Sequence, residues 1–195
     1  MSLMQTYKSF LTLKQSGRKA EARLIAMEVV RKYRDEPNPE FVYEICEQCD
    51  HKIDFMIWNG VVLPVLAEGL ESNPRAVRGM IRTIQNLYSS KSDWEALGYV
   101  TEEQLTARLL KLCPGDVWAQ DKRIEQLRDW LSYTIHEWPS GVLYGTDGAS
   151  IEKCAEILDA VEELQSLDSA GNHAELCDDV RQKTIQYRSR LASNA

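Results

Sequence analysis

Five cysteine and histidine side chains have the types, and part of the spacing, of a zinc site. They are Cys46, Cys49, His51, His173 and Cys177. Zinc takes four thiolate or imidazole ligands in a tetrahedron, and a CxxC sequence usually supplies two of them from a tight loop. Here the CxxC lies in a predicted helix among apolar residues, where cysteines are more often small core residues. We therefore predict no metal or other cofactor, and keep zinc binding as an alternative.

His136 is the histidine best placed for catalysis. It lies at the end of the longest predicted helix, before a glycine-rich loop, residues 140–149, in which Tyr144, Thr146 and Asp147 could line a pocket. The same residues also have a structural explanation, because a histidine in a last helical turn complements the helix dipole and Asp and Gly form turns. The loop follows no predicted strand and matches no phosphate-binding fingerprint. A small all-α enzyme is thus the alternative to a non-enzymatic protein.

Arg75, Arg78 and Arg82 recur three and four residues apart on one predicted helix, opposite its apolar face. Guanidinium groups bind carboxylates and phosphates in a bidentate manner, so this row is the predicted partner-binding surface. A solvated helix face, with Arg78 bonded inside the fold, is the other explanation. Trp130 lies off the face that Trp118 and Trp138 share, and is predicted either to anchor a partner or to pack under a neighbouring helix.

The elements that must position these residues are helices. Asn38-Pro39 and Asn73-Pro74 each place an N-cap residue before a proline at the first helical position. Thr101 opens a capping box, and Asp116 and Ser150 are further N-cap candidates. The predicted helices cover residues 3–15, 19–34, 39–49, 52–59, 62–72, 74–89, 102–112, 117–138, 151–167 and 173–191. Only residues 52–65 also allow a strand, which Gly60 would interrupt.

Two stretches resemble known helical repeats. Residues 62–87 resemble a HEAT repeat, with Leu63-Pro64 opening the first helix, Asn73 in the turn and Val77-Arg78 in the second helix. Residues 17–37 resemble the second half of a tetratricopeptide repeat, although Ala26 stands where an aromatic residue is usual. These resemblances imply an all-α fold, an irregular α-solenoid or helical-repeat-like bundle of about nine or ten helices. They also imply a concave surface that binds a protein or peptide. We expect one domain over residues 1–195, with 1–90 and 91–195 as its sub-units.

Charge is strongly segregated along the chain. Residues 1–34 carry eight basic and two acidic side chains, whereas residues 135–179 carry eleven acidic side chains and the single base Lys153. An acidic surface repels phosphate backbones, so nucleic acid is not an expected partner. Instead we expect a basic protein or peptide, which this chain would sequester or neutralise. The basic and acidic ends also allow a homodimer.

Composition and cysteine usage place the chain among cytoplasmic proteins. The five cysteines are scattered through apolar helical segments, as in proteins of a reducing compartment. The most apolar stretch, residues 55–70, is too short and too broken by polar residues, Gly and Pro to span a bilayer. The main hypothesis from sequence is therefore a cytoplasmic, non-enzymatic helical protein that binds another protein and no membrane.

Overall fold

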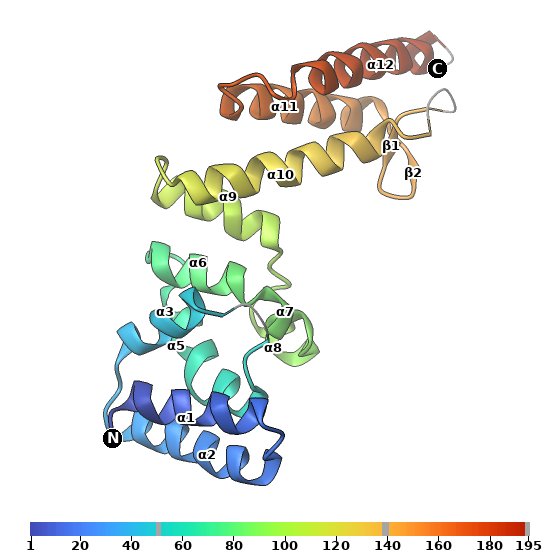
Figure 1. The fold of residues 1–195 in the computed structure, drawn as a ribbon. Helices are drawn as coiled ribbons and strands as arrows, with labels where there is room; N and C mark the ends of the chain where they lie inside the picture. Colours follow the sequence, from blue (N-terminus) through green and yellow to red (C-terminus); the bar gives the residue numbers. More distant parts are fainter. Residues whose placement is uncertain (50–51, 138–140, 194–195) are drawn as a thin grey trace. The chain divides into compact units, whose positions relative to one another are not determined.

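The computed structural model describes residues 1–49, 52–137 and 141–193, whose regular secondary structure is helical apart from one short β-hairpin (Figure 1). This confirms the all-α class. The chain divides into two compact units, Met1–Pro114 and Gly115–Ala195.

The first unit is built from helices alone within its described residues. They are α1 (Leu3–Gln15), α2 (Lys19–Asp35), α3 (Pro39–Glu47), α4 (Phe55–Ile57), the π-helix η1 (Trp58–Val62), α5 (Leu63–Gly69), α6 (Pro74–Arg82), α7 (Ile84–Tyr88), α8 (Lys91–Ala96) and α9 (Glu102–Leu112). The second unit contains α10 (Val117–Thr134), the strands β1 (Leu143–Tyr144) and β2 (Asp147–Gly148), α11 (Ile151–Leu167) and α12 (Ala174–Ser193).

The predicted helix starts are confirmed by their caps. The side chains of Asn38 and Asn73 accept hydrogen bonds from the first turns of α3 and α6, each with proline at the first helical position. Thr101 forms a complete capping box with Gln104, while Asp116 and Ser150 cap α10 and α11. These caps satisfy amide groups that have no partner inside the helix, and they depend only on neighbouring residues.

The segment around Gly60 differs from its prediction. α4, η1 and α5 follow one another without a break from Phe55 to Gly69. The predicted break between helices 52–59 and 62–72 is therefore wrong, and so is the strand alternative over residues 52–65. A Cβ at Gly60 would lie 2.9 Å from a Cγ atom of Val30, which shows how closely η1 approaches α2. The glycine is therefore present for a tight contact between helices and not for a turn.

Three further features were not predicted. α8 is a short additional helix that Ser90 caps, and α10 ends at Thr134 although helix was expected to residue 138. Residues 143–148 form an antiparallel hairpin, with Leu143 opposite Gly148 and Tyr144 opposite Asp147. Gly145 begins its two-residue turn with a φ of +66°, a conformation that strains other L-residues.

In the first unit, α1 packs along α2 as a helical hairpin, and α2 also packs on α4 and η1. The HEAT-like segment forms α5, α6 and α7, and α6 packs against α3, α5 and α9. Val77, Ile81, Ile84 and Leu87, the predicted apolar face of this segment, are all buried. Within this segment α5 and α6 thus form a packed pair of helices, and its assignment as a HEAT-like repeat stays a prediction.

In the second unit, α10, α11 and α12 each pack on the other two and lie side by side (Figure 1). The core of this three-helix bundle includes Leu127 and Leu131 of α10, Ile157 and Leu164 of α11, and Val180 of α12. The β-hairpin lies beside α10, and Val142 just before it is fully buried in the same core.

Candidate functional site

The arginine row of α6 faces α3. A guanidinium nitrogen of Arg75 lies 2.6 Å from a carboxylate oxygen of Glu40, and the other lies 3.4 Å from Glu47. The Arg75 guanidinium also lies 4.7 Å from the ring centroid of Tyr43. The hydrogen bond with Glu40 raises the pKa of Arg75 further, so this side chain is a permanent cation held by α3.

The other two arginines of the row extend the same contact region. Arg82 is exposed and donates a hydrogen bond of 3.1 Å to the backbone carbonyl oxygen of Glu47 at the end of α3. Arg78 is half-buried. Arg75 and Arg82 of the predicted partner-binding row therefore contact α3 within the chain, and binding of a partner by this row stays a prediction.

Trp130 packs within the second unit. Its side chain is half-buried against the bundle core, and its ring meets the Tyr144 ring edge-to-face with centroids 5.9 Å apart. The sequence allowed Trp130 either to anchor a partner or to pack under a neighbouring element, and the contacts in the structure are those of packing. A role as partner anchor stays a prediction.

His136 lies beside the last turn of α10 and is exposed. Its Nδ1 atom is 2.7 Å from the carbonyl oxygen of Tyr133, and its Nε2 atom is 3.5 Å from a carboxylate oxygen of Glu137. Among the described residues, no hydroxyl or thiol group is hydrogen-bonded to this histidine, so no nucleophile–base pair is formed there. Ser140, the first residue of the predicted loop site, lies outside the described residues. Thr146 and Asp147 are exposed at the hairpin.

Tyr144 is instead part of a cluster with α11 that sequence reasoning missed. Its hydroxyl group donates a 2.6 Å hydrogen bond to Glu156, and the Lys153 amine lies 2.9 Å from the same carboxylate and 4.4 Å from the Tyr144 ring centroid. Hydrogen bonds from Tyr144 and Lys153 lower the pKa of Glu156, and the bond to Glu156 raises the pKa of Lys153. The spacing of Lys153 and Glu156 on a helix was the available signal. The cluster fastens the hairpin to α11.

The cysteine and histidine candidates for zinc binding are divided between the two units. Cys46 is fully buried, and burial raises the pKa of its thiol to about 12, so it stays protonated. Cys49 is half-buried, and Cys177 is buried in the core of the second unit. His173 lies just before α12, and His51 lies outside the described residues. Within the part of the chain that is described, no group of three or more His, Cys, Asp or Glu side chains could hold a metal ion.

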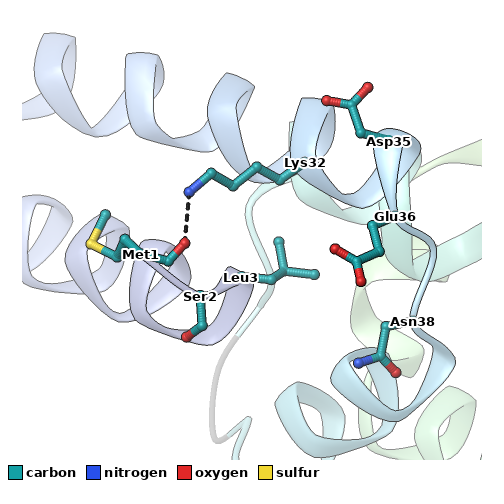
Figure 2. A pocket seen from close by; sticks show the side chains of 7 residues that line it. All are labelled: Met1, Ser2, Leu3, Lys32, Asp35, Glu36 and Asn38. Atoms are coloured by element: carbon teal, nitrogen blue, oxygen red, sulfur yellow. Dashed lines mark hydrogen bonds between the residues drawn. The ribbon is translucent and has the colours of Figure 1, made fainter.

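A hollow of about 430 Å³ lies where the start of α1 meets the end of α2 (Figure 2). Lys32 of α2 reaches across it and donates a 3.0 Å hydrogen bond to the carbonyl oxygen of Met1. Asp35 and Glu36 lie on the same side as the backbone of Lys32, at the end of α2. The same amine also bonds Thr6 and pairs with Glu28 at 3.1 Å. The Lys32 amine, the cation of this hollow, thus already joins α1 to α2.

The outer face of α11 is a continuous acidic stripe, which we define as Glu152, Glu156, Asp159, Glu162 and Glu163. From Glu152 to Glu162 these residues recur every three or four positions, opposite the buried side of the helix, and Glu163 follows directly. Glu156 is held by Lys153, and Glu163 forms a bidentate pair with Arg123 of α10 at 2.7 and 2.6 Å. Asp159 and Glu162 have no ion pair within the described residues. The stripe therefore presents unneutralised carboxylates to solvent.

Comparison with known proteins assigns no family. No protein-family model matches the sequence, and no curated protein or solved structure matches it either. Within the described residues, no helix is both long enough and apolar enough to cross a membrane.

Proposed function

We propose that this chain is a non-enzymatic helical protein that binds a basic partner protein through the acidic stripe of α11. The observation that carries the proposal is the distribution of charge between the units. The second unit has 15 acidic and 8 basic side chains, a net charge of −7, whereas the first unit has 15 of each. The entire net charge of the chain therefore belongs to the second unit.

The stripe also supports this proposal by its geometry. It lies on one straight helix of 17 residues whose opposite side is anchored in the bundle core, so its carboxylates are held on a rigid support. Complementary charge steers association and selects partners more than it adds raw affinity. A basic partner would therefore bind quickly, and raising the salt concentration would slow its binding.

Affinity capture with matched charge variants tests the proposal. We expect Asp159→Lys/Glu162→Lys to lose most of the basic proteins that the unaltered chain captures from native lysate. For those still bound, the association rate should depend less on salt. The control, Glu95→Lys/Glu103→Lys, reverses two exposed acids of the first unit that have no ion pair within the described residues, and therefore makes the same change in net charge.

Three results would contradict the proposal. Equal capture of every partner by the α11 variant would show that the stripe steers no association. An equal loss in both variants would show that bulk charge, and not this helix face, governs binding. Captured proteins that are acidic as a group would also contradict it.

A further inference from the structure

The outer face of α2 exposes apolar side chains that no other described element covers. Leu24 is 61% exposed and Met27 is 44% exposed, although both lie in the middle of a 17-residue helix. The opposite face of α2 is fully used, since Ala22, Ala26 and Val29 are buried in the first unit. Phe55 of α4, which packs on α2, is 70% exposed. Isolated exposed apolar residues are common, but three on contiguous elements indicate an interaction surface.

A recess lies beside these residues, between α2 and α4. Its volume is about 390 Å³, which is within the usual range for binding cavities. Its lining residues are Met27, Val30, Arg31, Arg34, Asp35 and Met56. We call this recess together with Arg23, Leu24 and Phe55 the α2 groove.

The groove is built on a rigid base. Val30 at its floor is held by η1, because a Cβ at Gly60 would lie within 2.9 Å of the Val30 side chain. π-helical segments are rare and often occur at functional sites, and this one begins two residues after Met56, at Trp58. The two methionines of the lining supply flexible apolar surface that adapts to a bound side chain.

The polar margin of the groove is basic. Arg23, Arg31 and Arg34 share the exposed face of α2 with Leu24 and Met27, at helical spacings of three, four and seven residues. Arg31 pairs with Asp35 across 3.4 Å, but no ion pair to Arg23 or Arg34 is found among the described residues. Two guanidinium groups beside an apolar recess are thus available to carboxylates of another molecule.

We propose that the α2 groove binds an acidic amphipathic helix of a partner protein. The exposed stripe from Leu24 to Arg34 follows the axis of α2 for about 15 Å, the length of three turns of a helix laid along it. Such a helix would place one apolar side chain in the recess and its glutamates or aspartates against Arg23 and Arg34. Arg23 and Arg34, for which no ion pair is found among the described residues, select this occupant over a basic one.

The site is separate from the acidic stripe of α11. It lies in the other unit and takes a partner of opposite charge. If the α2 groove binds no peptide, the function proposed for the acidic stripe is unaffected. If the acidic stripe binds no partner, the proposal for the α2 groove is likewise unaffected.

Selection from a displayed peptide library tests the groove directly. The library consists of helical peptides of about 18 residues with a fixed leucine stripe, in which the flanking positions vary among Glu, Lys, Gln and Ser. The full chain should enrich peptides with Glu beside the leucine stripe. Arg23→Glu/Arg34→Glu should reverse this preference and enrich Lys at the same positions. The control Lys8→Glu/Lys111→Glu, which alters two exposed lysines of the same unit by the same charge, should still enrich Glu.

An enriched acidic peptide is then synthesised and its affinity measured by fluorescence anisotropy. We expect Arg23→Glu/Arg34→Glu, and separately Leu24→Ser/Met27→Ser, to weaken binding by about tenfold or more, because charged and apolar contacts are both needed. The lysine control should change the affinity by less than about twofold. All four positions of the two test variants are on the surface of α2, and the melting temperature of each variant checks that it is folded.

Several outcomes would overturn the proposal. They are no enrichment, the same charge preference in the unaltered chain and in Arg23→Glu/Arg34→Glu, or an affinity that the Leu24→Ser/Met27→Ser variant leaves unchanged. Sedimentation of the chain with vesicles of mixed phosphatidylserine and phosphatidylcholine, which the selected peptide fails to reverse, would assign the groove to a lipid surface instead.

Discussion

In the first unit, acidic and basic side chains are equal in number, and arginines connect one helix to another. Arg75 of α6 binds two glutamates of α3, and Arg108 of α9 lies 2.7 Å from a carboxylate oxygen of Glu71, in the turn before α6. In the second unit acids exceed bases by seven, and Arg123 of α10 forms a comparable bidentate link to α11. The comparison shows that paired charges join helices in both units, and that only the second unit has a large excess of acidic side chains on its surface.

The largest expected effect is the loss of stability when a core leucine of either unit is truncated. Leu131 and Leu66 are both fully buried, one in the second unit and one in the first. Each Leu→Ala substitution should lower the free energy of unfolding by about 2–5 kcal/mol, because it removes apolar contacts and leaves a cavity. Hydrogen exchange should accelerate mainly in α10, α11 and α12 for Leu131→Ala, and mainly in α5 and α6 for Leu66→Ala. Equal acceleration throughout the chain in both variants would contradict a division into two cores.

The next effect concerns alkaline pH and the first unit. Burial raises the pKa of Cys46 from 9.0 to about 12 and that of Tyr7 from 10.0 to about 12. Above pH 9 the unfolded chain loses these protons before the folded chain does, so stability is full below pH 9 and falls as the pH rises towards 12. We expect a loss on the order of 1–3 kcal/mol, followed by urea unfolding at a series of pH values.

Two variants check the origin of this alkaline effect. Cys46→Ala should reduce the dependence on pH, because it removes a buried thiol whose pKa is raised in the folded chain. Tyr7→Phe should also reduce it, because it removes the phenol group whose pKa burial raises. A fall in stability that is identical in all three proteins would assign the effect to other groups.

The smallest expected effect is the loss of stability when either of two interhelical arginines, Arg123 or Arg75, is removed. Arg123 has 18% of its side chain exposed, whereas Arg75 has 44% exposed. Arg123→Ala should lower the free energy of unfolding by about 1–2 kcal/mol, because the bidentate bond to Glu163 is partly shielded from water. Arg75→Ala should lower it by less than about 1 kcal/mol, as expected for exposed ion pairs. Thermal unfolding of both variants in low and high salt measures the difference, and a larger loss for Arg75→Ala would reverse the comparison.

The candidate sites were predictable only in part. The acidic character of residues 135–179 was visible in the sequence, and helical spacing places its members on one face of α11. The α2 groove was not anticipated, although Leu24, Met27, Arg31 and Arg34 recur at helical spacing. The sequence shows that such residues share a face, but not whether another helix covers that face. The packing of α1, α4 and η1 on α2 leaves Leu24 and Met27 exposed, and only the tertiary structure shows this.

The sequence by itself determined the helical class and most helix starts, because a cap such as Asn73 with Pro74 depends on atoms within one turn. The tertiary structure decided what lies opposite each face. It turned the predicted binding arginine Arg75 towards α3, placed Gly60 within a π-helix against Val30, and joined Tyr144 to Glu156. These contacts join residues that lie 12 to 35 positions apart. Local propensity carries no information about such pairs, and the packing of the whole unit selects them.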